Sequence, residues 1–182
     1  MMTGATTMVL TQLVMVAIMA MTPIHMRTHG HDLQATGLVI AVHIAGMYLP
    51  SPLTGLLVDR LGRIPVAVAS GLTLLVAGVI AAGAPTDSVV ALAVALALLG
   101  LGWNLGLVSG TAMVTDALPV RTRARTQGAV DLCVALAGAG GGIASGVILS
   151  ATSYSTLALG SGVVALAIIP FIVRRRPADA AV

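Results

Sequence analysis

Charged residues divide the chain into long apolar runs. Asp, Glu, Lys and Arg are absent from five stretches, at residues 1–26, 33–58, 64–86, 88–115 and 132–173. A helix that crosses the bilayer core of about 30 Å needs about 20 apolar residues, so each of the first four runs predicts one spanning helix. The last run is long enough for two helices, and the polar segment ATSYST inside it predicts a short turn between them.

The pattern therefore predicts an all-α fold, a polytopic membrane protein whose residues 1–182 form a single bundle of six transmembrane helices. The first span has no basic segment before it and is followed by further spans, so we do not expect a signal peptide. The predicted spans are 5–25, 35–58, 64–84, 88–113, 127–150 and 156–173.

Composition supports a surface that faces lipid. Hydrophobic residues make up 58% of the chain and charged residues 8%, and the mean hydropathy is +1.05. Soluble domains carry about 25% charged residues. The net charge of +3 would suit nucleic-acid binding in a soluble protein, but aromatic residues make up only 2% and the arginines lie between the apolar runs, which excludes that class. The one cysteine, Cys133, lies in an apolar run, and we expect a small buried side chain there.

The arginines predict the orientation in the membrane. All arginines but Arg27 lie after the second, fourth or sixth predicted span, and these three places share one side of the membrane. Basic residues near span ends concentrate on the cytoplasmic side. Both termini are therefore predicted to be cytoplasmic. The tail arginines are also expected to contact anionic lipid headgroups. The eight arginines on this side are Arg60, Arg63, Arg121, Arg123, Arg125, Arg174, Arg175 and Arg176.

A charged motif occupies the predicted cytoplasmic turn between the second and third spans. The segment GLLVDRLGR at 55–63 resembles the G-x-L-x-D-R-x-G-R signature of the major facilitator superfamily. Downstream, Asp116, Pro119 and Arg123 resemble the acidic-x-x-P-x-x-x-R pattern that ends the fourth helix of a half in that family. The positions that match the signature are Gly55, Leu57, Asp59, Arg60, Gly62 and Arg63.

The resemblance implies one half of a transporter. The family is built from two six-helix halves, each made of two three-helix inverted repeats. Segments 12–26 and 37–52 resemble the seventh and eighth helices of a bacterial drug or metabolite permease, which favours the C-terminal half. The missing N-terminal half or a second protomer would then be a partner of this chain. The protein would lie in the bacterial cytoplasmic (inner) membrane.

The resemblance also implies a latch at the cytoplasmic side. Asp59 would cap the N-terminus of a helix in the other half, where the helix dipole favours an anion. Arg63 would pair with Asp116. The alternative is a solvated turn that only sets topology.

Four polar residues inside the predicted spans are candidates for the transport cavity or for proton coupling, because polar groups at membrane depth face protein or water. Asp131 could carry a proton or form a structural ion pair. His43 could contact substrate or a proton, or hydrogen-bond to a neighbouring helix. Trp103 and Asn104, set among glycines, could line the cavity or serve packing.

Small residues and prolines shape the spans. Gly138, Gly142 and Gly146 stand four residues apart and predict a helix-packing face. This region is similar to the glycine-rich fifth helix of antiporters, but it lacks that motif's proline, so antiport is not implied. Pro50 and Pro52 are expected to kink the second span; Pro23 and Pro170 are expected to act in the same way.

Other classes of function find little support. His25, His29 and His31 lie near one predicted loop, but without Cys or Glu beside them we expect a solvated loop and no metal. No serine has the spacing of an intramembrane protease, and no histidine follows residue 43. We therefore expect no enzyme activity and no cofactor. The predicted function is transport of a small molecule by alternating access as half of a secondary transporter, with proton-coupled efflux as one mode; the alternative is a membrane fragment that does not transport by itself.

Overall fold

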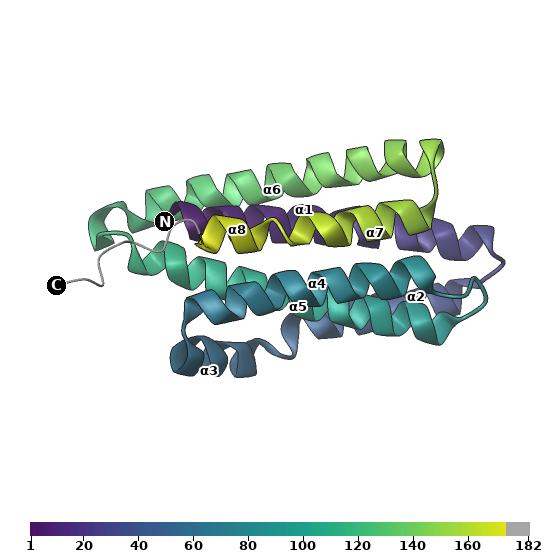
Figure 1. Cartoon of the computed structure of the whole chain (residues 1–182), viewed down its shortest axis with the longest axis horizontal. Helices are drawn as coiled ribbons and strands as arrows, with labels where there is room; N and C mark the ends of the chain where they lie inside the picture. Colours follow the sequence, from purple (N-terminus) through teal and green to yellow (C-terminus); the bar gives the residue numbers. More distant parts are fainter. Residues whose placement is uncertain (174–182) are drawn as a thin grey trace.

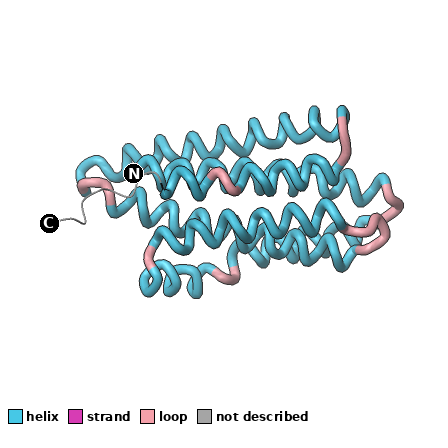
Figure 2. The backbone as a smooth tube through the Cα atoms, viewed as in Figure 1, coloured by secondary structure: helices cyan, strands magenta, loops and turns pink. Residues whose placement is uncertain are grey.

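The computed structural model describes residues 1–173, and these form a helical bundle (Figures 1 and 2). Six helices or helix pairs are long and apolar enough to cross a membrane, which confirms the predicted fold class. The tail arginines Arg174, Arg175 and Arg176 lie outside the described residues. In order the helices are α1 (Met2–Thr28), α2 (Leu33–Tyr48), α3 (Ser51–Leu61), α4 (Arg63–Gly83), α5 (Val89–Asp116), α6 (Val120–Ala151), α7 (Tyr154–Ala165) and α8 (Ile168–Val173).

Two of the six crossings are made of two helices each. The second is α2 followed by α3, and the break falls at Leu49 and Pro50, as Pro50 and Pro52 predict. The sixth is α7 followed by α8. Pro170 cannot donate to the carbonyl of Leu166, which instead accepts from Ile169 N at 3.0 Å, and the helix breaks there. Pro23, by contrast, lies inside the unbroken α1.

Short polar residues begin several helices. The carboxylate of Asp32 accepts from Ala35 N at 2.7 Å at the start of α2, and the hydroxyls of Ser88 and Ser153 accept from backbone N–H groups at the starts of α5 and α7. Such caps satisfy N–H groups that have no partner inside the helix. Between α3 and α4 the turn is a single residue, Gly62, with φ of +90°. This conformation is costly for any other residue, so the glycine of the motif fixes the sharp turn.

The central helix of the bundle is α5, and its glycines bring the neighbouring helices close. A Cβ at Gly100 would meet the backbone of His43 in α2, and one at Gly102 would lie 2.8 Å from Leu74 in α4. A Cβ at Gly110 would lie 2.5 Å from Met8 in α1. Close approach through small residues is the usual means of packing helices in lipid. The buried cluster around α5 includes Ile18, Leu74, Leu92, Leu96, Leu99 and Ile168.

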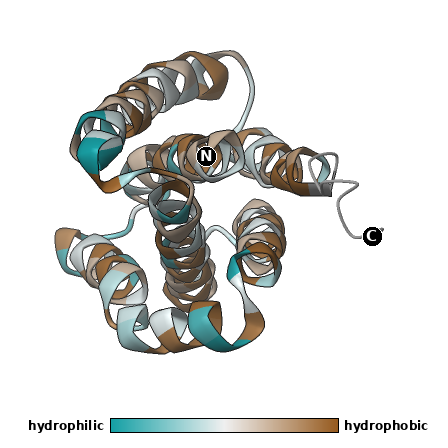
Figure 3. Ribbon diagram, turned by 90° about the vertical axis from the view of Figure 1, so that its left-hand side faces the viewer, coloured by the Kyte–Doolittle hydropathy of each residue, from teal (hydrophilic) through white to brown (hydrophobic). Residues whose placement is uncertain are grey.

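The helix α6 is the most exposed crossing. In its most apolar window 11% of residues are buried, against 56% for α5, and it packs mainly on α1 (Figure 3). Gly138 and Gly141 lie against Gln12 and Leu13 of α1, and the buried Val130 clusters with Met8 of the same helix. Cys133 is exposed on this helix, so the expectation of a buried thiol was wrong: the apolar run is a helix with an uncovered face.

The start of α6 also differs from the predicted span. The helix begins at Val120, directly after Pro119, instead of near residue 127. Proline favours the beginning of a helix because its fixed φ suits the first turn and its missing N–H is not needed there. Arg121, Arg123 and Arg125 therefore lie in the first turns of α6, and the loop is shorter than expected. Figure 3 looks onto this end of the bundle and shows hydrophilic segments in teal at separate places on it.

Candidate functional site

The charged motif residues map to one end of the bundle, which we call the motif end. It comprises the N-terminal residue Met1, the turn at Gly62 between α3 and α4, and the end of α5 at Asp116. Because the turn is a single glycine, Arg63 becomes the first residue of α4. Asp116 is the last residue of α5, and the two helices pack along each other.

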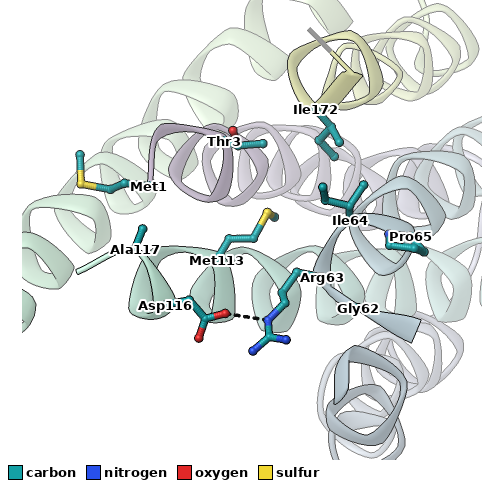
Figure 4. A pocket seen from close by; sticks show the side chains of 10 residues that line it. All are labelled: Met1, Thr3, Gly62, Arg63, Ile64, Pro65, Met113, Asp116, Ala117 and Ile172. Atoms are coloured by element: carbon teal, nitrogen blue, oxygen red, sulfur yellow. Dashed lines mark ion pairs between the residues drawn. The ribbon is translucent and has the colours of Figure 1, made fainter. Parts of the chain in front are cut away.

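Arg63 and Asp116 form an ion pair at this end. The guanidinium Nε of Arg63 lies 2.7 Å from Oδ2 of Asp116, and the two side chains are 40% and 52% exposed (Figure 4). A cavity of about 570 Å³ lies beside the pair and is lined on its apolar side by Met1, Ile64, Met113 and Ile172. The pair thus joins α4 to α5 and forms part of the wall of this open pocket.

The other motif residues lie on α3. Asp59 and Arg60 are exposed in its last turn, and Gly55 is half-buried, with no atom within 4 Å of the place that a Cβ would occupy. The carboxylate of Asp59 is thus directed away from the core of the described helices. Its capping of a helix in another half stays a prediction.

Two of the candidate polar residues lie between α2 and α5. His43 is buried, and its Nδ1 donates to the carbonyl of Leu96 at 2.9 Å, while its Nε2 is buried without a hydrogen-bond partner among the described residues. The amide of Asn104 donates to the carbonyl of Met47 at 2.7 Å and to the hydroxyl of Ser51 at 2.8 Å. Thr54 donates to Oδ1 of Asn104 at 2.5 Å. The side chain of Asn104 therefore makes all three of these hydrogen bonds to residues inside the bundle.

Trp103 turns toward a different helix. Its indole N–H donates to Oε1 of Gln12 in α1 at 2.7 Å, and its ring meets that of Tyr48 edge-on with centroids 5.9 Å apart. Gln12 in turn reaches toward α6, where a Cβ at Gly138 would lie 3.0 Å from its Nε2. Trp103, Gln12 and Tyr48 form a polar and aromatic group shared by three crossings, which we call the indole group.

The remaining candidates are placed apart from these groups. Asp131 is exposed on α6 and accepts a hydrogen bond from Gln127 one turn earlier, at 3.2 Å. Gly142 contacts Val16, and no atom lies within 4 Å of a Cβ at Gly146. Within the described chain α6 approaches α1 most closely at Gly138 and Gly141, and a role of Gly146 in helix packing stays a prediction.

The three outer histidines lie at the end opposite the motif end, where His25 and His29 contact each other and His31 contacts Thr86. The ring of His25 stacks on Tyr154 with centroids 4.2 Å apart. His29 donates from Nδ1 to the carbonyl of His25, and His31 donates from Nε2 to the carbonyl of Thr86, each at 2.8 Å. In residues 1–173 no group of three or more His, Cys, Asp or Glu has the geometry of a metal site.

Sequence reasoning missed four residues of these groups: Gln12, Tyr48, Ser51 and Thr54. The signal for Gln12 was present, since an amide in the middle of an apolar span must find a partner. The roles of Tyr48, Ser51 and Thr54 depend on which side of α2 and α3 faces α5.

The similarity to known proteins extends over nearly the whole chain. Residues 4–182 match the Major Facilitator Superfamily. An uncharacterised MFS-type transporter of Bacillus subtilis, YdeG, is 61% identical over 173 residues, which cover 95% of this chain and 40% of that protein. A second from the same organism, YddS, is 54% identical, with 94% and 39% covered. The riboflavin transporter RfnT of Brucella anthropi is 36% identical, with 92% and 42% covered.

The chain thus spans about 40% of the length of these relatives. The relatives are transporters and not enzymes, and the helices have the length and composition of membrane spans. By its matched residues and its six spans, this chain belongs to the major facilitator superfamily.

Proposed function

We propose that the chain is one six-helix half, the C-terminal one, of a secondary transporter that moves a small molecule by alternating access. It would lie in the bacterial cytoplasmic membrane with both termini and the motif end on the cytoplasmic side. The observation that carries the proposal is the ion pair between Arg63 and Asp116. It joins two helix ends beside a cavity, as a contact that opens and closes one side of the transporter would do.

A second half is needed to complete the transporter. The exposed faces of α2 and α6 are apolar, and the chain is about 40% as long as its relatives. We propose that the N-terminal half covers the exposed face of α6, and that a helix N-terminus of that half receives the carboxylate of Asp59. A second protomer is the other partner that could cover this face.

The indole group is the proposed contact for the transported molecule. Gln12 and Tyr48 offer hydrogen bonds and an aromatic ring among apolar side chains, and Tyr48 is exposed in the described chain. Such a surface suits a neutral molecule with a ring better than an ion. Riboflavin is the first compound to assay, because RfnT is named as its transporter. Efflux and proton coupling through His43 or Asp131 are further parts of the proposal.

Association in lipid tests the proposal. The chain is co-expressed with a six-helix N-terminal half, assembled in nanodiscs and weighed by native mass spectrometry. Cys133, exposed on α6, is labelled with a maleimide before and after assembly. We expect a one-to-one complex that protects Cys133 and restores uptake or efflux of riboflavin in vesicles; Cys133→Ser is the labelling control.

The alternative is a membrane fragment or subunit that does not transport by itself. The observation that favours it is the chain's length relative to its relatives. A monomer that neither binds a second half nor transports in vesicles would establish this alternative and overturn the transporter proposal. A dimer of this chain with a Cys133–Cys133 crosslink would identify a second protomer as the partner.

A further inference from the structure

Asn104 bridges the break in the second crossing from both sides. One amide proton is donated to the carbonyl of Met47, near the end of α2, and the other to the hydroxyl of Ser51, the first residue of α3. Its carbonyl accepts from Thr54, one turn into α3. Two donors and one acceptor of a single side chain are therefore divided between the two helices that meet at Pro50.

The break needs such a bridge because prolines weaken it. Pro50 and Pro52 have no N–H, so the carbonyls of Gly46 and Tyr48 lose the donors that a continuous helix would supply. Without those backbone bonds, the angle between α2 and α3 depends on side chains. Asn104 and Thr54 are 2% and 1% exposed, so water does not compete for their hydrogen bonds.

Few other contacts hold α3. Its buried residues are Thr54 and Val58 alone, and Val58 packs in a cluster with Leu105, the neighbour of Asn104 in α5, and with Val66 of α4. At its far end the chain turns at Gly62 into Arg63, which pairs with Asp116, again in α5. The start of α3 therefore contacts α5 directly, its middle packs between α4 and α5, and its end is joined to α5 through Arg63 of α4.

We propose that Asn104 is a positioning residue that fixes the angle between α2 and α3 and so holds the Gly62 turn where Arg63 reaches Asp116. Its side chain acts on the motif end from a distance, through α3. The importance of this position for transport rests on the proposed function. The position of α3 itself does not, and it can be measured without a substrate.

Distances between spin labels test the proposal directly. In a Cys133→Ser background, labels are attached at Leu57→Cys on α3 and at Val94→Cys on α5, both of which are exposed. Asn104→Leu removes all three hydrogen bonds and keeps the branching of the side chain. We expect the distance distribution to broaden or to split into two populations, and the Arg63–Asp116 coupling in a double-mutant cycle to fall toward zero.

The matched control is Ser109→Ala. Ser109 is also buried in α5, but its hydroxyl donates to the carbonyls of Leu105 and Gly106 in its own helix, so its loss should leave the distribution unchanged. Thr54→Val should broaden the distribution, and Thr54→Ser, which keeps the donor, should restore it. This pair keeps the test available if Asn104→Leu does not fold.

The proposal is overturned if folded Asn104→Leu or Thr54→Val gives the parent distribution, or if Ser109→Ala broadens it equally. That result would leave the proposed transport function untouched. If the variants broaden the distance distribution but the chain never transports, the role of Asn104 is supported. Only the proposed transport function is then overturned.

Discussion

The guanidinium of Arg63 lies 2.7 Å from the carboxylate of Asp116, so the first residue of α4 is joined to the last residue of α5. The contact brings together two sequence motifs separated by two membrane crossings. Both side chains are partly exposed, so solvent screens their attraction. We therefore expect the Arg63–Asp116 pair to determine where the ends of α4 and α5 lie, and to contribute little to the free energy of unfolding.

Charge reversal tests this pair. Arg63→Asp and Asp116→Arg alone should each impair transport by the assembled protein, and the double reversal should recover part of it. The coupling free energy in a double-mutant cycle of unfolding should be only about 0.2–1 kcal/mol, typical of exposed pairs. Arg125→Asp, at an exposed arginine of α6 that belongs to neither motif, is the control. Absence of any recovery in the double variant would mean that the two residues do not act together.

Loss of a buried hydroxyl should destabilise the end opposite the motif end. Thr22 donates to the carbonyl of Ile18, so its Oγ1 accepts from the hydroxyl of Tyr154 at 2.8 Å. Tyr154→Phe removes this bond but keeps the ring stacked on His25, and it should cost about 0.5–1.5 kcal/mol in detergent unfolding. Tyr48→Phe, which removes an exposed hydroxyl, should change stability by less than about 0.5 kcal/mol. Equal effects would argue against the Thr22–Tyr154 bond.

The glycines of α5 should tolerate no side chain where the helices touch. Gly100→Ala would direct a methyl group against the backbone of His43 and Met47, and overpacking of this kind costs about 1–3 kcal/mol. Gly37→Ala, in α2 with no atom within 4 Å of the new Cβ, should instead be neutral or stabilise by up to about 1 kcal/mol through helix propensity. Denaturant unfolding followed by circular dichroism compares the two. A stabilising Gly100→Ala would contradict the close packing of α2 on α5.

Trp103 is the only tryptophan, so its fluorescence reports on the indole group. Gln12→Leu removes the acceptor of the indole N–H, and we expect emission to shift to shorter wavelength. Leaving a buried donor unpaired should also cost about 1–3 kcal/mol of stability. Gln34→Leu, at an exposed position of α2, is the control and should not shift the emission. An unchanged spectrum in Gln12→Leu would show that Gln12 does not bond Trp103 in solution.

Sequence by itself determined the class of protein, the number of crossings and the family motif. These follow from local properties: about 20 apolar residues between charges are enough for one span, and Pro50 and Pro52 break a helix wherever they occur in it. The pairing of Arg63 with Asp116 was implied by resemblance to the family, because their spacing by itself does not bring them together.

Only the tertiary structure decided which side of each helix faces its neighbours. A soluble helix reveals its inner face by an apolar stripe, but these spans are apolar all round, so the pattern carries little information about their rotation. For this reason only the packed bundle shows the partners of Asn104, the bond between Gln12 and Trp103 and the exposure of Cys133. The same holds for the close approach of α6 to α1 at Gly141. In lipid, close packing and hydrogen bonds between helices fix rotation, and both depend on residues far apart in the chain.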